Sequence, residues 1–196
     1  MTDRIPILVV NGSVRPRNYT AKASALVVDE FRKDPQVSVE VVDPAKLDLP
    51  FPGTRPGAEP TRQLQEKVRA ASGVVLATPE YHGSFSSVIK LVIENLGFPS
   101  ALLGKPVALL GVAAGSIGAI KSLEQLRSVC SHVGAIALPL PVSVANVQKV
   151  FDADGRCLDA GVEKLVRGVA TNLMNYLRNA VCPALQLERI LREGVA

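Results

Sequence analysis

Three short segments carry the residue types that bind phosphates and flat rings. The first loop, residues 12–20 (Gly-Ser-Val-Arg-Pro-Arg-Asn-Tyr-Thr), combines hydroxyl and amide donors with Arg15 and Arg17. A loop that enters a helix presents backbone N–H groups to an anion, and arginine adds charge-assisted hydrogen bonds to phosphate. The same polar residues are also ordinary turn and N-cap residues. The loop has neither the Walker A pattern nor the Gly-x-Gly-x-x-Gly pattern, but its two arginines and its position after the apolar run of residues 5–10 favour phosphate binding.

The second loop, residues 78–84 (Thr-Pro-Glu-Tyr-His-Gly-Ser), contains the rings of Tyr81 and His82 and is expected to form a turn over residues 79–84. Exposed backbone amides beside these rings could hold a flat heteroaromatic ligand by its edge. His82 is a candidate for proton transfer, and the competing interpretation is a solvated or locally hydrogen-bonded ring. A Ser-His-Asp hydrolase is not indicated, because the chain has no Gly-x-Ser-x-Gly elbow. Ser84 and Ser86 are expected to cap the helix that follows.

The third loop, residues 113–118, places Gly115 and Gly118 around Ser116, which is expected to be an N-cap. Glycines permit close approach of the backbone to a ligand, and they also suit a plain strand-to-helix turn. Two separated histidines and scattered cysteines do not make a ligand set, so no metal site is predicted.

Strands and helices alternate along the chain in a way that positions these loops. Apolar runs predict strands over residues 5–10, 37–42, 73–78, 106–112 and 135–138. Helical periodicity predicts helices over residues 20–33, from an N-cap at Thr61, and over residues 86–96, 117–132 and 162–177. Residues 43–60, rich in proline, glycine and charge, are expected to form a long loop.

Five apolar strands alternating with five main helices predict a doubly wound parallel sheet with both faces covered. Ligands of such sheets bind at the carboxyl ends of the strands. The three loops follow strands at that edge, so we expect them to meet there.

Length and composition favour a single globular domain and argue against a disordered or nucleic-acid-binding protein. The chain has 196 residues, of which 47% are hydrophobic and 4% aromatic, with a net charge of +4. The length predicts one domain, residues 1–196, against roughly 100–200 residues per domain. The apolar content argues against disorder, and so small a basic excess without a Lys/Arg-rich run predicts no nucleic-acid partner.

The cysteines and the start of the chain bear on location. Cys130, Cys157 and Cys182 are an odd number, and none lies in a Cys-x-x-Cys spacing. The chain begins without a secretory leader pattern, and no apolar run reaches about 18 residues. We therefore expect reduced thiols in a cytoplasmic protein that does not insert into a membrane.

The three loops together resemble the NAD(P)H-dependent FMN reductases of flavodoxin-like fold. Residues 12–15 (Gly-Ser-Val-Arg) are similar to the family's Gly-Ser-x-Arg phosphate loop, and the second loop looks like its Pro-Glu-Tyr-[Asn/His]-Gly-Ser flavin loop. Lys90 and the glycine-rich third loop also match, so the resemblance spans about residues 5–140. The sequence departs from the family at Asn18, Thr20 and Leu91, where the family often has Ser, Asn and Asn.

The resemblance implies a flavodoxin-like, three-layer α/β/α sandwich with a five-stranded parallel sheet and one bound FMN. NADH or NADPH would be the co-substrate. The residues that it implies as cofactor-binding are Ser13, Arg15, Asn18, Tyr19, Thr20, Pro79, Glu80, Tyr81, His82, Gly83, Gly115, Ser116 and Gly118. His82 is in addition a candidate proton donor, and no other catalytic residue is implied.

The implied activity is a ping-pong reaction, in which hydride passes from the nicotinamide to FMN and electrons then pass to a small acceptor. Free flavin, quinones, azo compounds and metal oxyanions are the acceptors considered. The family also implies a homodimer or homotetramer, and the apolar surplus of residues 86–96 fits either an interface or a buried helix. Alternative functions are an FMN-binding electron-transfer protein without NAD(P)H activity and a nucleotide-dependent transferase or hydrolase.

Overall fold

The computed structural model describes residues 4–193, which form a sheet between two layers of helices. The strands are β1 (Ile5–Asn11), β2 (Val37–Val42), β3 (Gly73–Tyr81), β4 (Ser84–Phe85), β5 (Pro106–Val112), β6 (Ile136–Ala137) and β7 (Val142–Val144). The helices are α1 (Tyr19–Arg32), α2 (Glu59–Ala70), α3 (Ser87–Glu94), α4 (Ile120–His132), α5 (Val147–Val150), α6 (Ala160–Tyr176) and α7 (Cys182–Glu193). A 3₁₀ turn spans Pro44–Lys46, and a π-helical segment, Leu177–Val181, joins α6 to α7.

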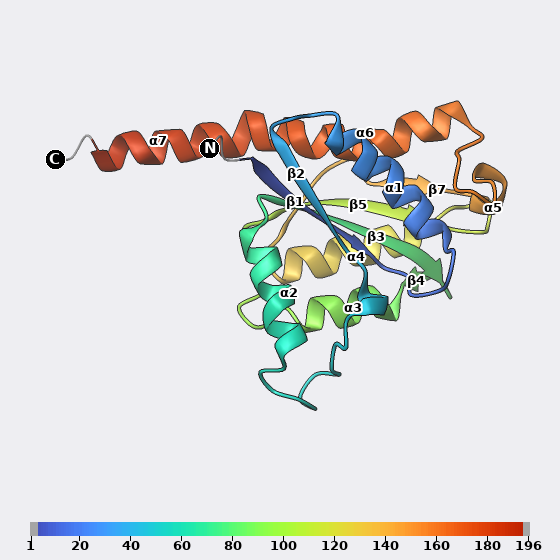
Figure 1. The fold of residues 1–196 in the computed structure, drawn as a ribbon, viewed down its shortest axis with the longest axis horizontal. Helices are drawn as coiled ribbons and strands as arrows, with labels where there is room; N and C mark the ends of the chain where they lie inside the picture. Colours follow the sequence, from blue (N-terminus) through green and yellow to red (C-terminus); the bar gives the residue numbers. More distant parts are fainter. Residues whose placement is uncertain (1–3, 194–196) are drawn as a thin grey trace.

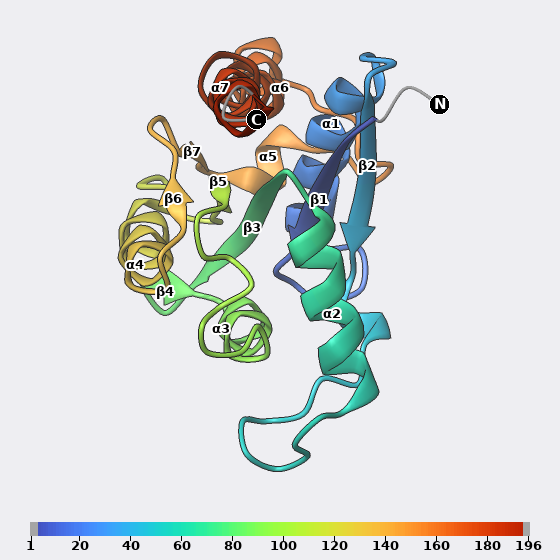
Figure 2. The same ribbon diagram turned by 90° about the vertical axis from the view of Figure 1, so that its left-hand side faces the viewer.

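The sheet has the strand order β2-β1-β3-β5-β6, and every pair on this path is parallel. Strand β4 pairs antiparallel with the end of β3, and β7 pairs parallel with β5. Helices α1 and α6 cover one face, and α2, α3 and α4 cover the other (Figures 1 and 2). The structure confirms the predicted three-layer α/β/α sandwich with five core strands, to which β4 and β7 are added.

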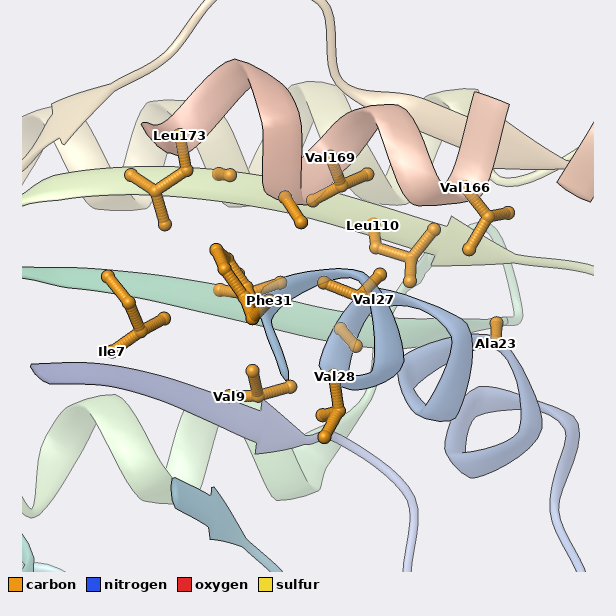
Figure 3. Close-up of a cluster of buried hydrophobic side chains, with 14 of the residues drawn as sticks. Ile7, Val9, Ala23, Val27, Val28, Phe31, Leu110, Val166, Val169 and Leu173 are labelled. Carbon is orange, nitrogen blue, oxygen red and sulfur yellow. The ribbon is translucent and has the colours of Figure 1, made fainter. Parts of the chain in front are cut away.

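Aliphatic side chains fill the space between the sheet and the α1–α6 layer. Figure 3 shows part of this cluster, with Ile7, Val9 and Leu110 from the strands, Val27 and Phe31 from α1, and Val166, Val169 and Leu173 from α6. A second cluster fills the opposite side. Strand β5 is buried along its whole length and β3 along all but its last two residues. The continuous apolar runs in the sequence predicted this, because parallel strands are covered on both faces.

The last predicted strand, residues 135–138, is mostly absent. Only the two residues of β6 pair with β5, and the chain then returns to the same neighbour as β7. The break falls at Pro139 and Pro141, which lack the N–H that a ladder needs, and at Leu140, whose φ is 62°. Strand β7, three residues directly after these prolines, was not predicted from the sequence.

Two helix starts also differ from the prediction. Helix α2 begins at Glu59, with Pro60 in its first turn, where a missing N–H costs little. Thr61 is therefore inside the helix, and its hydroxyl donates to Asn95 Oδ1 at 2.7 Å. The helix predicted over residues 117–132 begins at Ile120. Gly118 has a φ of 78°, which is outside the right-handed helical region.

The remaining helices follow the predicted register closely. The helix expected over residues 20–33 is α1, and the one over residues 86–96 is α3 with Ser86 as its N-cap. The helix expected over residues 162–177 is α6, which continues through the π-helical segment into α7 and beyond the body of the molecule (Figure 1).

Candidate functional site

A cavity of about 500 Å³ lies where the loops after β1, β3 and β5 meet, toward the right of Figure 1. The residues that line it are Ser13, Arg15, Pro16, Arg17, Asn18, Tyr19, Thr20, Pro79, Glu80, Tyr81, Val112, Ala113, Ala114, Val147 and Gln148. Two hollows of about 770 and 650 Å³ are larger, but neither is lined by a residue of the three loops. The switch-point rule favours the smaller cavity, because ligands of open parallel sheets bind beyond the carboxyl ends of the strands.

The first loop is shaped by Asn18, the N-cap of α1. Its Oδ1 accepts a hydrogen bond from the Ala21 amide at 2.7 Å. Its Nδ2 donates to the carbonyls of Arg15 at 2.7 Å and Ser13 at 3.3 Å. Asn18 therefore begins the helix and at the same time closes the loop into a curve that faces the N-terminus of α1.

Buried hydroxyls in and beside this loop lack partners. Ser13 is 2% exposed and Thr20 is 1% exposed, and neither Ser13 Oγ nor Thr20 Oγ1 has a hydrogen-bond partner within residues 4–193. An unpaired buried hydroxyl costs about 1–3 kcal/mol, so native structures rarely leave one without a reason. Both residues line the cavity. A ligand with acceptor oxygens would satisfy both.

The charge around these hydroxyls suits an anion. The first loop enters α1, whose N-terminus carries a partial positive charge. Arg15 and Arg17 are exposed at the cavity wall, and neither forms an ion pair in the described part of the chain. Two hydroxyl donors, a helix N-terminus and two free guanidinium groups match the chemistry of a phosphate monoester.

Gly12 allows the first loop to pack tightly against its neighbours. A Cβ atom at this position would lie 2.4 Å from the Ala77 carbonyl oxygen and 2.5 Å from Cγ1 of Ile89. The Gly12 amide donates to the Ala77 carbonyl at 2.7 Å. Its own carbonyl accepts from the Ser86 hydroxyl at 2.6 Å, so β3 and α3 both hold the base of the loop.

The second loop forms a β-hairpin, where the sequence had predicted a turn over residues 79–84. Strand β3 runs on to Tyr81, and Glu80 and Tyr81 pair with Phe85 and Ser84. The two residues between the strands, His82 and Gly83, have φ of 51° and 74°. Positive φ at both central residues is typical of the type I′ turn that fits a two-residue hairpin.

Of the hairpin side chains predicted to bind the cofactor, Glu80 and Tyr81 line the cavity and His82 does not. Tyr81 lines the cavity and is 38% exposed. Glu80 lines the cavity too, but its Oε2 accepts from the Ser122 amide and hydroxyl on α4, each at 3.2 Å. His82 is exposed and lies outside the lining, and its ring has no hydrogen-bond or ion-pair partner among the described residues.

The third loop lies next to the cavity. Its first residues, Ala113 and Ala114, line the wall, but Gly115, Ser116 and Gly118 do not. Ser116 is not the N-cap of α4, contrary to the expectation. The helix begins after Ala119, whose amide donates to Ser143 Oγ on β7 at 2.8 Å.

The structure therefore brings together eight of the predicted site residues around one cavity. They are Ser13, Arg15, Asn18, Tyr19, Thr20, Pro79, Glu80 and Tyr81. Val147 and Gln148 of α5 complete the wall and were missed, and Gln148 Nε2 donates to the Ala114 carbonyl at 3.1 Å. Recognition of β7 as a strand would have found them, because α5 follows its carboxyl end.

Other chemistry finds little support in the structure. Across residues 4–193, no three His, Cys, Asp or Glu side chains gather as metal ligands. Burial raises the pKa of the Cys130 thiol to about 12, which keeps it from acting as a nucleophilic thiolate. In the same described range, no helix is long and apolar enough to cross a membrane.

Comparison with known proteins points to flavin-dependent oxidoreductases. A family model described as NADPH-dependent FMN reductase matches residues 5–149. An NAD(P)H-dependent FMN reductase of Pseudomonas aeruginosa is 30% identical over 186 residues, which cover 91% of this chain and 98% of that protein. An NADPH azoreductase of a Bacillus species is 31% identical over 174 residues, 87% of this chain and 92% of that protein.

The fold is similar to that of a solved flavoenzyme, the NAD(P)H:(acceptor) oxidoreductase FerB from Paracoccus denitrificans. The TM-score is 0.74 at 22% identity, with 89% of this chain and 97% of that one covered. At this identity the likeness concerns the fold, which is the flavodoxin-like arrangement that the sequence predicted.

Proposed function

Because the chain belongs to the NADPH-dependent FMN reductase family, we propose that it binds FMN in the 500 Å³ cavity and uses it to oxidise NADH or NADPH. The observation that carries this proposal is the pair of buried, unpaired hydroxyls of Ser13 and Thr20 beside Arg15. They supply donors and charge for the one phosphate of FMN.

Residues of all three loops would hold the cofactor. Ser13, Arg15, Asn18, Tyr19 and Thr20 would surround its phosphate. Pro79, Glu80, Tyr81, His82 and Gly83, with Gly115, Ser116 and Gly118, would flank the ribityl chain and the ring. Asn18 serves mainly by shaping the loop, since both ends of its amide are already engaged.

Bound FMN would supply the redox chemistry, accepting hydride from a nicotinamide and passing two electrons to an acceptor. The protein contributes binding, orientation and electrostatics. Backbone amides of the hairpin would stabilise the negative charge that develops on the ring. His82, exposed at the turn, is the candidate to protonate the acceptor.

A single cavity serves both substrates in this proposal. The described chain offers one hollow lined by the three loops, so the nucleotide and the acceptor would occupy it in turn, in a ping-pong sequence. Acceptors would be small molecules such as free flavin, quinones, azo compounds or metal oxyanions. The azoreductase name of one relative supports the azo class.

We propose that residues 1–196 act as one domain in a cytoplasmic homodimer or homotetramer. Of the apolar residues of α3, Ile89, Val92 and Ile93 are buried within the chain itself. Val88 and Leu91 remain half-buried and available to a second copy.

Anaerobic mixing with NADH and with NADPH tests the proposal. The protein loaded with FMN should lose its visible flavin absorbance with at least one nucleotide, and initial rates against an azo dye or a quinone should give parallel double-reciprocal lines. A flavin that stays oxidised with both nucleotides overturns the reductase function. Intersecting lines overturn the shared cavity.

Binding of FMN through the first loop is tested separately. Arg15→Ala should weaken FMN binding about tenfold or more, from loss of a charge-assisted hydrogen bond of about 1.5–3 kcal/mol. The matched control is Arg62→Ala on α2, an exposed arginine outside the cavity. Equal FMN affinity of Arg15→Ala and the wild type would contradict the phosphate assignment.

A further inference from the structure

One side chain of α4 holds the tip of the hairpin formed by residues 80–85. The Ser84 hydroxyl donates to Oε1 of Gln125 at 2.6 Å, and Nε2 of Gln125 donates to the Gly83 carbonyl at 3.0 Å. Both polar atoms of the amide are thus used on consecutive residues of the hairpin. Gln125 itself is exposed and does not line the cavity.

A second contact holds the base of the hairpin to the same helix. The Glu80 carboxylate accepts from the amide and hydroxyl of Ser122. Ser122 and Gln125 are three positions apart, so they lie on one face of α4. Figure 2 shows β4 beside α4, consistent with a hairpin fastened to that helix at two points.

The hairpin has few backbone pairs of its own, so the contacts to α4 are a large part of what holds its shape. Its strands contribute only two residue pairs, Glu80 with Phe85 and Tyr81 with Ser84. Beyond Pro79, which pairs with Val112 of β5, these two pairs are the only ladder that β3 forms in the described structure, and so short a two-stranded ladder is marginal in water. His82 holds a positive φ that non-glycine residues rarely adopt. Without the contacts to α4, the turn and the adjacent Tyr81 would sample other positions.

We propose that Gln125 is a positioning residue that fixes the hairpin against the edge of the bound flavin ring. The inference rests on the proposed function, in which hairpin amides face the ring. Preorganised amides stabilise developing negative charge only when they are held in place. Loss of the Gln125 contacts would therefore lower the stability of the reduced cofactor, leaving the distant phosphate contacts intact.

The first test uses the protein without cofactor. In Gln125→Ala, hydrogen exchange of the amides in residues 81–84 should rise about tenfold or more, while exchange in residues 12–20 stays at the wild-type rate. The matched control is Glu124→Ala, the adjacent exposed residue of α4, which makes no hydrogen bond to the hairpin. Unchanged exchange at the hairpin in Gln125→Ala overturns the proposal, as does an equal rise in the control.

The second test measures the reduction potential of bound FMN by dye-coupled titration, which needs no nucleotide. Gln125→Ala should weaken binding of reduced FMN about tenfold relative to oxidised FMN, a shift of about 30 mV to more negative potential for two electrons. The affinity for oxidised FMN should change by less than roughly threefold, or about 0.7 kcal/mol. An unchanged potential, or an equal loss of affinity for both forms, overturns the positioning role.

A double-mutant cycle checks that Gln125 acts through the hairpin. Ser84→Ala removes only one of the two contacts, so its shift in potential should be smaller than that of Gln125→Ala. In the Gln125→Ala background, Ser84→Ala should add nothing. If the shifts in potential of the two single variants add in full in the double variant, Gln125 does not act through the hairpin and the positioning role is overturned. Failure of the proposed function is distinguishable, because it appears in the wild type as a flavin that neither nucleotide reduces.

Discussion

The first loop and the hairpin face the same cavity, but their polar groups find partners in different places. In the first loop, the hydroxyls of Ser13 and Thr20 are buried and unpaired in the described structure. In the hairpin and its continuation, Ser84 and Glu80 bond to α4, and Ser86 bonds to Gly12 and Ile89. The polar groups of the hairpin are satisfied within the protein, whereas the buried hydroxyls of the first loop have no partner among residues 4–193, and the proposed function assigns them to a ligand.

This difference separates two kinds of mutational effect. Where the protein satisfies its own polar groups, a substitution should change the free energy of unfolding of the apo protein. Where a ligand satisfies them, a substitution should leave the apo protein as stable or make it more so, and should weaken ligand binding.

Gly12→Ala should affect both stability and cofactor binding, because Gly12 joins the first loop to β3 and to the start of α3. Its Cβ would overlap the Ala77 carbonyl oxygen, a backbone atom that cannot move freely. We expect a loss of about 3 kcal/mol in the free energy of unfolding, the upper end for overpacking, together with weaker FMN binding. Urea denaturation measures the free energy of unfolding, and FMN titration measures the affinity for the cofactor. Gly168→Ala on α6, with open space around its Cβ, is the control and should not destabilise.

Ser86→Ala should reduce stability without much change in cofactor binding. The substitution removes the N-cap bond to the Ile89 amide and leaves the buried Gly12 carbonyl without its donor. Together these should cost about 2 kcal/mol in urea denaturation of the apo protein. FMN affinity, measured under conditions where the variant is folded, should stay within roughly threefold, or about 0.7 kcal/mol. A variant that is as stable as the wild type but has lost FMN binding would show that Ser86 serves cofactor binding and not stability.

The contrast between these regions was only partly visible in the sequence. The apolar runs of β1, β3 and β5 and the loops after them could be predicted, since burial on both faces leaves a local pattern. The hairpin could not, because His82 adopts a left-handed conformation that the contacts to Gln125, far along the chain, help to hold. Nor could α5, which reaches the cavity only because β7 returns to β5 after two prolines.

Thr20→Val should have the opposite effect to Ser86→Ala. Valine matches threonine in shape and removes a hydroxyl that has no hydrogen-bond partner among residues 4–193. The apo protein should gain about 1 kcal/mol, while FMN binding weakens about tenfold, near the ~1.5 kcal/mol of a hydrogen bond to a charged group. Calorimetric titration and urea denaturation of one preparation give both values. If the apo protein is destabilised instead, the hydroxyl has a partner within the protein and the contrast with the hairpin fails.

Gly115→Ala tests whether the third loop contacts the cofactor, as proposed for the first loop, or is satisfied within the protein, as the hairpin is. The ideal Cβ meets nothing within 4 Å, and the φ of Gly115 is not in the left-handed region, so alanine fits the apo backbone. Reduced freedom of the unfolded chain should then raise stability by about 0.5 kcal/mol. If the open space is where the cofactor approaches the backbone, FMN affinity should fall about threefold, or 0.7 kcal/mol. Unchanged affinity would mean that the glycine serves the turn alone and that Gly115 does not contact the cofactor. The third loop would then resemble the hairpin, with its Gly115 carbonyl satisfied by the amides of Gly118 and Asn146.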